Sequence, residues 1–288
     1  MKYSKQIAVC IILVMSGMLP VKAQKKSINV GSNNGKYILI DNTKLYYEQY
    51  GKGTPLLLLH GGLSSMRTFK YVIPELSKHF RVIAVDAPGQ GRSEQADSVS
   101  FQLMADYYSK MIDQLKLDSV YVWGFSVGCI TAFHLAADRP DKVKMLVAHS
   151  GVSNLAGWNE GFMNTTELTP EFIEQNVKWW LDGHMKTNPQ KDKWKKFIND
   201  FRNMWKPDEF ISDEKLQKIK CQTLYVMGDK DLVRPEHGLK LHDLIKGSEF
   251  CILPNTTHFI LDENPTLINT MALDFLLKKK IHSFRFSY

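Results

Sequence analysis

The chain is poor in cysteine and has no apolar run as long as a membrane span, and each shortage excludes a class of protein. Its 288 residues include four cysteines, which are too few and too widely spaced for a disulfide scaffold or a zinc site. The apolar run over residues 7–19 is shorter than the roughly 20 residues that cross a bilayer. Internal repeats and low-complexity tracts are also absent from the sequence. The fold must therefore be held together by an ordinary hydrophobic core.

The N-terminal residues have the pattern of an export signal. Lys2 and Lys5 precede the apolar run, and the small-x-small sequence of residues 21–23 follows it, as a cleavage site would. We therefore predict a signal peptide over residues 1–23, export to the periplasm or the extracellular medium, and no stable membrane span after cleavage. A membrane anchor, the alternative, is disfavoured by the short length of the run.

The predicted mature chain has little net charge. The sequence has 37 Lys and Arg against 30 Asp and Glu, a formal net charge of +7, and loss of Lys2, Lys5 and Lys22 would lower it to +4. Four further cations lie in the C-terminal stretch 278–285. A nucleic-acid interface needs basic residues spread over one face with interleaved aromatic residues. We therefore predict no nucleic-acid partner.

The bulk composition is that of a soluble globular protein. Hydrophobic residues make up 44% and charged residues 23% of the chain. A single α/β domain commonly uses about 200 to 250 residues, so this length accommodates one domain with an insertion. Outside the predicted signal peptide there are three cysteines, Cys129, Cys221 and Cys251. We expect them to be buried free thiols.

Strand and helix patterns alternate along most of the chain. Residues 24–35 are polar and patternless and are predicted to form a flexible leader. Two β-rich runs within residues 37–50 predict an antiparallel hairpin, and the continuous apolar run 55–60 predicts a strand buried on both faces. Further strands are predicted over residues 80–86, 119–123, 143–149, 222–227 and 249–253, and helices over 67–79, 101–117, 127–137, 236–246 and 265–280. The alternation predicts an α/β fold with a mostly parallel central sheet and helices on both faces.

The alternation breaks over residues 153–219. This stretch contains five of the six tryptophans and two helical segments, near residues 169–186 and 190–206, with no apolar strand between them. We interpret it as a helical insertion packed over the sheet. The core is then formed by residues 36–152 and 220–288.

Ser126 stands in a pattern typical of a catalytic nucleophile. It is the centre of Gly124-Phe125-Ser126-Val127-Gly128, between a predicted strand and a predicted helix. A sharp turn there exposes the serine hydroxyl, and the glycines allow the strand and the helix to approach closely. The five-residue pattern is weak alone, because ordinary turn serines also match it. Its strand-to-helix context favours the nucleophile.

A serine hydroxyl needs a histidine to accept its proton and an acid to orient that histidine. His258 follows the last predicted strand and precedes the closing helix, where the fold requires the base. Two aspartates, Asp229 and Asp231, follow the strand before it. We predict Asp231 as the acid, because it lies further past the strand end, and Asp229 as a residue that caps or orients the loop.

The negatively charged oxygen of a tetrahedral intermediate is usually stabilised by backbone N–H groups. Val127 directly follows the nucleophile and is predicted to supply one. The loop after residues 55–60 is predicted to supply the other, from Gly62 or alternatively from Leu63. A plain glycine turn would explain the same loop sequence.

The remaining histidines have structural interpretations. His60 is expected to fix its loop by hydrogen bonding, and His134 and His149 to be structural. Surface positions are expected for His79, His184, His237, His242 and His282. No histidine pair has metal-ligand spacing together with carboxylates or cysteines, so no metal and no cofactor is predicted.

Together these motifs resemble the single-domain α/β hydrolases. The resemblance rests on His60-Gly61-Gly62, on residues 86–93 (DAPGQGRS), on the turn around Ser126, on Gly228-Asp229-Lys230-Asp231 and on residues 256–259 (TTHF), in this order. It covers residues 36–280 apart from the insertion. By this resemblance the insertion 153–219 is a cap, and the substrate pocket lies between the cap and the sheet.

Departures from related patterns narrow the expected reaction. Dehalogenases and epoxide hydrolases of this kind would have Asp at position 126, and proline iminopeptidases typically show HGGPG where this chain has HGGLS. The resemblance then implies a serine esterase that acts through an acyl-enzyme, and the expected substrate is a small molecule with an apolar group. A carbon–carbon bond hydrolase or a lactonase on the same residues is the nearer alternative. A ligand-binding sensor without turnover is the alternative from another class.

Overall fold

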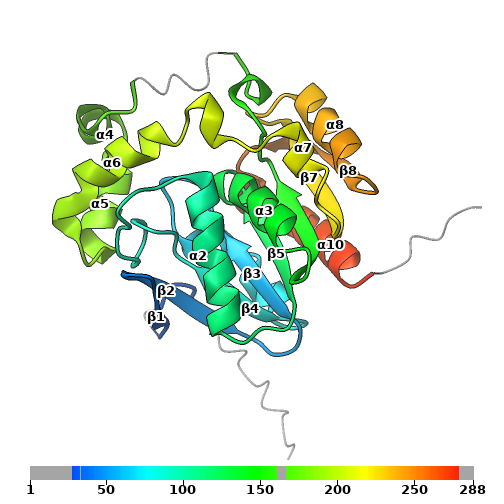
Figure 1. Ribbon diagram of the computed structural model, residues 1–288, viewed down its shortest axis with the longest axis horizontal. Helices are drawn as coiled ribbons and strands as arrows, with labels where there is room; N and C mark the ends of the chain where they lie inside the picture. Colours follow the sequence, from blue (N-terminus) through cyan, green and yellow to red (C-terminus); the bar gives the residue numbers. More distant parts are fainter. Residues whose placement is uncertain (1–27, 33, 161–166, 279–288) are drawn as a thin grey trace, which may run out of the picture.

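The computed structural model describes residues 28–32, 34–160 and 167–278. A single eight-stranded sheet lies at the centre, with helices on both sides (Figure 1). The strands are β1 (Lys36–Ile40), β2 (Thr43–Tyr50), β3 (Pro55–Leu59), β4 (Arg81–Val85), β5 (Val120–Phe125), β6 (Val143–His149), β7 (Gln222–Lys230) and β8 (Glu249–Thr257). The principal helices of the core are α1 (Ile73–Leu76), α2 (Phe101–Gln114), α3 (Val127–Asp138), α8 (Pro235–Leu244), α9 (Ile260–Glu263) and α10 (Pro265–Leu276). The chain has the α/β-hydrolase fold predicted from its sequence.

Strand β3 shows why its sequence is continuously apolar. Leu57 and Leu59 belong to the hydrophobic cluster that includes α2, α3 and α8. Leu56 and Leu58 belong to the cluster on the other face, which includes α1, α9 and α10. All four leucines are almost completely buried, because successive side chains of a strand point to opposite faces and both faces are covered.

The strand order brings the predicted motifs to one edge of the sheet. The order is β1-β2-β4-β3-β5-β6-β7-β8, with β1, β2 and β4 paired antiparallel and every other pair parallel. From β3 the chain crosses to β4 on one side and later to β5 on the other. In open α/β sheets ligands bind at such a reversal, outside the carboxyl ends of the strands. The loops after β3 and β5 both begin there.

Between β6 and β7 the described residues form helices and contribute no strand to the sheet. These helices are η2 (Leu155–Gly157), α4 (Pro170–Asn176), α5 (Lys178–Thr187), η4 (Lys191–Lys193), α6 (Trp194–Asn203), η5 (Pro207–Glu209) and α7 (Asp213–Leu216). Figure 1 shows α4, α5 and α6 grouped beyond the ends of α2 and β2. Phe197, Ile198 and Phe201 of α6 are buried on the side of the helix that faces the rest of the molecule. The arrangement matches the predicted helical segments.

The prediction of one continuous helix over residues 67–79 was wrong. The segment contains the short helix η1 (Met66–Phe69), a turn, and then α1, with Pro74 in the first turn of α1. Proline has no N–H to donate to the carbonyl four residues earlier, and its ring clashes with that carbonyl. A helix that begins at η1 therefore cannot continue through Pro74 and must restart beside it.

The described part of the predicted flexible leader is docked on the core. Val30 is buried, and Gly31 donates its N–H to Glu48 Oε2 at 2.9 Å. Arg67 and Arg92 donate to the carbonyl oxygens of Val30 and Gly31. A carboxylate and two guanidinium groups from distant segments thus hydrogen-bond to this backbone. A local sequence pattern cannot reveal such contacts. The predicted signal peptide, residues 1–23, lies outside the described residues.

The three described cysteines are free, as predicted, but only Cys129 is fully buried; Cys221 and Cys251 are partly exposed. Cys221 directly precedes β7, and Cys251 lies in β8, the last strand at this edge of the sheet. Within the described residues no helix is long and apolar enough to cross a membrane.

Candidate active site

Ser126 occupies the turn between β5 and α3 in a strained conformation. Its φ is +53° and its ψ is −119°, a combination that side chains rarely adopt, and its N–H donates to the carbonyl of His149 at 2.9 Å. A Cβ on Gly124 would lie 2.3 Å from the carbonyl oxygen of Gly128, and one on Gly128 would lie 2.1 Å from that of Leu59. Both glycines are therefore required for the close approach of strand and helix.

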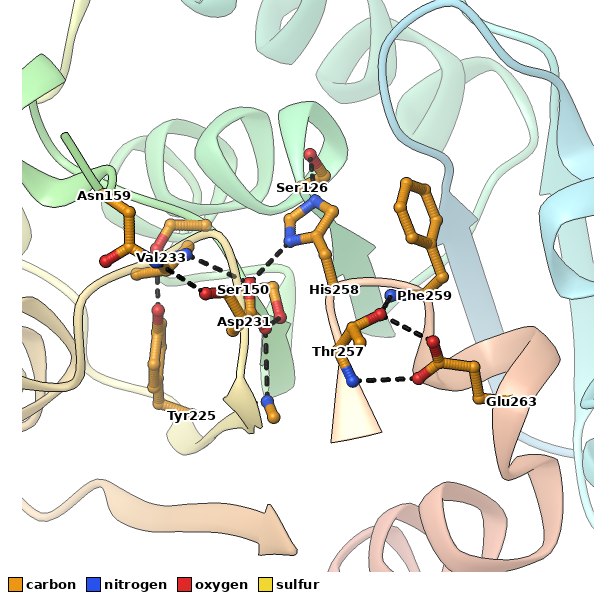
Figure 2. A network of polar contacts seen from close by, with 12 residues as sticks. Ser126, Ser150, Asn159, Tyr225, Asp231, Val233, Thr257, His258, Phe259 and Glu263 are labelled. Atoms are coloured by element: carbon orange, nitrogen blue, oxygen red, sulfur yellow. Dashed lines mark hydrogen bonds and ion pairs between the residues drawn. The ribbon is translucent and has the colours of Figure 1, made fainter. Parts of the chain in front are cut away.

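The structure brings the three predicted site residues together (Figure 2). His258 Nε2 lies 3.0 Å from Ser126 Oγ, and His258 Nδ1 lies 2.7 Å from Asp231 Oδ1. The His258 and Asp231 side chains are 6% and 0% exposed, so water does not compete for their contact. Both imidazole nitrogens are engaged, which fixes the ring between the hydroxyl and the carboxylate.

The two candidate aspartates take different places. Asp231 contacts His258, whereas Asp229 Oδ1 accepts a hydrogen bond from the backbone N–H of Thr256 at 3.0 Å. Asp229 therefore ties the end of β7 to the end of β8, directly before His258. Asp231 thus contacts the histidine as predicted, whereas Asp229 lies within β7 and joins it to β8 instead of capping the loop that follows.

Asp231 is held as a carboxylate. Burial alone would raise the pKa of this carboxyl, but the His258 ring, the Ser150 hydroxyl and the Val233 N–H together lower the pKa to about 2. The backbone N–H of Val233 donates to Oδ1 at 3.1 Å, and that of Gly228 donates to Oδ2 at 3.2 Å. The charge is thus available to stabilise an imidazolium on His258.

The His60 loop faces the nucleophile. The N–H of Ala87 donates to His60 Nε2 at 2.9 Å, so the other ring nitrogen carries the proton and donates to the Gly61 carbonyl at 2.7 Å. Burial lowers the pKa of His60 to about 4, which keeps it neutral. This histidine fixes the loop by hydrogen bonding, as predicted.

The residues predicted to supply the two N–H donors lie beside Ser126. Gly62, Leu63 and Val127 all line the cavity that contains Ser126 and His258. A Cβ on Gly62 would lie 2.4 Å from Phe201 Cζ and 3.0 Å from Val127 Cγ2, so the loop fits closely under α6. Leu63 has a φ of +48°, which marks a sharp turn there. Which of Gly62 and Leu63 donates stays a prediction.

A cavity of about 730 Å³ opens above these residues. Its walls are mostly apolar, and its charged side chains are Arg67, Lys70 and Asp262. Lys70 and Asp262 pair with each other at 2.6 Å. The aromatic and aliphatic lining comes from Leu63, Phe125, Trp158, Leu168, Trp179, Phe201, Trp205, Leu232, Phe259 and Leu261. The volume and the lining are typical of a site for a small molecule.

Two of the histidines predicted at the surface are buried. His184 on α5 packs against the Trp180 ring at 5.0 Å, and His237 on α8 accepts the N–H of Ser153 at 2.9 Å. Both contacts depend on how residues 153–219 pack, with His184 inside this stretch and His237 against Ser153 at its start, and no local pattern reveals them. His134 and His149 are buried, as expected for structural residues. Within the described residues no three His, Cys, Asp or Glu side chains are grouped in a way that could hold a metal ion.

Sequence reasoning missed two polar residues that hold Asp231. Ser150 donates its hydroxyl to Asp231 Oδ2 at 2.5 Å, and Asn159 Nδ2 donates to the backbone carbonyl of Asp231 at 2.8 Å. Each is more than 70 positions from Asp231 along the chain, and neither belongs to a recognisable motif. The position of Ser150 directly after β6 was the one available signal.

The chain is similar to known hydrolases. Residues 54–191 match the α/β hydrolase fold family. The serine hydrolase BPHL of Homo sapiens is 26% identical over 83% of this chain and 85% of its own length. The 2-hydroxy-6-oxo-2,4-heptadienoate hydrolase of Pseudomonas putida is 24% identical over 86% and 98%. The structure of carboxylesterase CesB from Bacillus subtilis superposes with a TM-score of 0.69, at 21% identity over 85% and 92%, and this likeness concerns the fold alone.

Proposed function

We propose, from the premise that this chain is a hydrolase of the α/β-hydrolase fold, that it cleaves carboxylic esters through an acyl-enzyme on Ser126. The observation that carries the proposal is the continuous contact from Ser126 Oγ through His258 to Asp231 at the base of the cavity. A hydroxyl in this setting can lose its proton to the imidazole as it attacks a carbonyl carbon.

The first half of the proposed reaction forms the acyl-enzyme. Ser126 Oγ attacks the ester carbon while His258 Nε2 accepts the hydroxyl proton, and Asp231 stabilises the resulting imidazolium through Nδ1–H. The tetrahedral intermediate then collapses, the bond to the alcohol oxygen breaks, and His258 returns the proton to that oxygen. The alcohol leaves and the acyl group stays on Ser126.

The second half repeats these steps with water. His258 accepts a proton from the water that attacks the acyl carbon, and then returns it to Ser126 Oγ as the acid leaves. In both halves the backbone N–H groups of Val127 and of Gly62 stabilise the negatively charged oxygen. Val127 is the first residue of α3, so its N–H has no partner four residues earlier in the helix.

The cavity favours an ester with an apolar acyl or alcohol group. Its lining is mostly aromatic and aliphatic, and the opposite charges of Lys70 and Asp262 neutralise each other. Burying apolar substrate surface against such walls contributes about 25 cal/mol per Å². We therefore expect activity to rise with acyl length until the cavity is filled.

Fluorophosphonate labelling tests the nucleophile directly. The probe phosphonylates an activated serine, so we expect wild type to gain one adduct that peptide mapping places on Ser126, and Ser126→Ala to gain none. Ser77→Ala, which removes a hydroxyl at the end of α1, is the matched control and should label like wild type. An unlabelled wild type would contradict the proposal and favour a sensor without turnover. Equal labelling of Ser126→Ala would also contradict it, because the activated nucleophile would then be another residue.

A second candidate is favoured by one comparison. The Pseudomonas putida relative is named as a hydrolase of 2-hydroxy-6-oxo-2,4-heptadienoate, so carbon–carbon bond cleavage is an alternative for the same three residues. A panel of p-nitrophenyl esters of increasing acyl length, a lactone and a vinylogous diketone separates the candidates. Ester turnover at least tenfold faster than the other two supports the esterase, and the reverse order contradicts it.

We also propose that the mature enzyme begins at Gln24 and acts outside the cytoplasm, from the signal pattern of residues 1–23. Expression of the full chain and N-terminal sequencing of the exported protein test this proposal. Recovery of the uncleaved chain from the cytoplasm alone would contradict it.

A further inference from the structure

A buried serine stands behind the carboxylate of Asp231, on the side away from the cavity. Ser150 directly follows β6, as Ser126 directly follows β5, and the two strands are paired up to Phe125 and His149. Ser150 is 0% exposed and has a φ of +52°. A residue other than glycine in this conformation costs free energy, and such strain is concentrated at functional sites. The side chain must therefore supply something that glycine cannot.

The Ser150 hydroxyl is aimed at one oxygen of Asp231. It donates to Oδ2 at 2.5 Å, a distance typical of a charge-assisted hydroxyl–carboxylate hydrogen bond, and Figure 2 shows the two side chains facing each other. The His258 ring occupies the other oxygen, Oδ1. Among the described residues, Ser150 and His258 are thus the two side chains that hydrogen-bond to this carboxylate, and the backbone N–H groups of Gly228 and Val233 do so as well.

The backbone of Ser150 is anchored independently of its hydroxyl. Its N–H donates to the carbonyl of Val226 on β7 at 3.0 Å, which joins the end of β6 to the strand that leads to Asp231. Next to it, the Tyr225 hydroxyl donates to the Gly151 carbonyl at 2.8 Å. Removal of the hydroxyl would therefore leave the loop in place and change mainly the carboxylate.

We propose that Ser150 is a positioning residue, which turns the Asp231 carboxylate so that Oδ1 faces His258 and takes up part of its negative charge. The inference rests on the proposed function of Ser126, His258 and Asp231. Through the shared charge, Ser150 sets how firmly the carboxylate holds an imidazolium, although it contacts neither the substrate nor His258.

Few other titratable groups face this carboxylate. Tyr225 on β7 and His149 on β6 are close enough to interact with Asp231, and both are fully buried. Burial raises the pKa of Tyr225 well above its ordinary value and lowers that of His149 to about 3. Neither group changes charge between about pH 5 and 9, so neither contributes to a pH response in that range.

The test uses Ser150→Ala and Ser150→Gly in the full chain. Both variants remove the hydroxyl, and glycine also accepts the positive φ without strain. The rate of fluorophosphonate labelling is measured from pH 5 to 9. We expect both variants to label about tenfold more slowly at the optimum, and the acid limb to move upward by about half a pH unit, because a carboxylate that has lost a donor holds the imidazolium more tightly.

Ser153→Ala is the matched control, because it removes another buried serine hydroxyl from the same loop, where the neighbour is His237. Its profile should superpose on that of wild type. A second readout needs no reaction: the downfield proton resonance of the imidazole N–H of His258 should shift in both Ser150 variants and stay in place in Ser153→Ala.

The outcomes separate this inference from the proposed function. Failure of wild type to label overturns the proposed function, and the resonance then still tests Ser150. Normal labelling of wild type with an unmoved acid limb and an unmoved resonance in both variants overturns the role of Ser150. A response in Ser150→Ala that is missing in Ser150→Gly overturns it too, because both lack the hydroxyl.

Discussion

The floor and the roof of the cavity are built in different ways. The floor, here Ser126 and His258 at the cavity with Asp231 and Ser150 behind them, is polar, and each of its residues directly follows a strand. Every one of its side chains has a hydrogen-bond partner. The roof, here Trp158, Trp179, Phe201 and Trp205, consists of aromatic residues from the segment between β6 and β7.

The two regions differ most clearly in whether their buried polar atoms have hydrogen-bond partners. On the floor, both ring nitrogens of His258 are hydrogen-bonded. Beside the roof, neither ring nitrogen of His184 has a partner, nor does Trp205 Nε1, among the residues that the structure describes. Attack and proton transfer need interatomic distances fixed to a few tenths of an ångström. Apolar packing needs the right total volume, and side chains of similar volume can replace one another. Variants should therefore be costly on the floor and mild on the roof.

The largest expected effect is Asp231→Asn. The amide cannot hold His258 in the productive tautomer, and in serine proteases the equivalent change lowers kcat by about 10⁴. Ester hydrolysis near pH 7 should fall by a factor of this order while the circular dichroism spectrum stays unchanged. Asp229→Asn is the matched control; because its amide oxygen can still accept the N–H of Thr256, it should keep most of the activity. Equal losses in both variants would remove Asp231 from the site.

Acid should weaken the roof through His184. Burial lowers the pKa of His184 from 6.5 to about 4. Between these values the unfolded chain binds a proton that the folded chain does not, so stability is lost as pH falls from 6.5 towards 4. One such group accounts for a loss of about 3 kcal/mol at the lower limit. Thermal unfolding between pH 7 and 4.5 measures it.

His184→Leu removes this titration, so its midpoint should fall less steeply with pH than that of wild type. His79→Leu, at an exposed position, is the control and should keep the wild-type slope. If His184→Leu also keeps that slope, His184 does not contribute to acid instability.

The smallest expected effect tests the contact between floor and roof. In Gly62→Ala the new Cβ would lie 2.4 Å from Phe201 Cζ, so the loop or α6 must move. We expect kcat/KM to fall by about tenfold to a hundredfold, because a displaced N–H donor stabilises the oxyanion poorly. Phe201→Leu in the same chain should restore part of the loss. Gly183→Ala, where a Cβ on α5 meets nothing within 4 Å, is the neutral control.

An unchanged kcat/KM in Gly62→Ala would mean that the donor is elsewhere in the loop, and Leu63 is the alternative. An equal loss in Gly62→Ala and in the double variant would mean that Phe201 does not transmit the strain. Either result would show that floor and roof are less closely fitted than the distances suggest.

The sequence predicted those parts of the site that are determined by residues close together along the chain. The glycines around Ser126 are required by backbone contacts within one turn, so the pattern is visible in five residues. His258 and Asp231 follow strands whose order is fixed by the alternation of the chain. The break between η1 and α1 also has a local cause, Pro74. The sequence conceals it because the helical spacing of apolar residues continues across the break.

The parts that sequence missed depend on residues far apart along the chain. Ser150 and Asp231 are 81 positions apart and meet because β6 and β7 are neighbours in the sheet. The docking of Val30 and Gly31 depends on Glu48, Arg67 and Arg92. The burial of His184 depends on how α5 packs. No spacing rule connects such partners.

The sequence by itself determined the α/β-hydrolase fold and the order of nucleophile, acid and histidine, because strand periodicity and turn glycines act over a few residues. Only the tertiary structure decided which aspartate reaches His258, which hydroxyl stands behind that aspartate, and which aromatic side chains close the cavity. Those contacts are made across strands and between the helical segment and the sheet, where the distance along the chain carries no information about the distance in space.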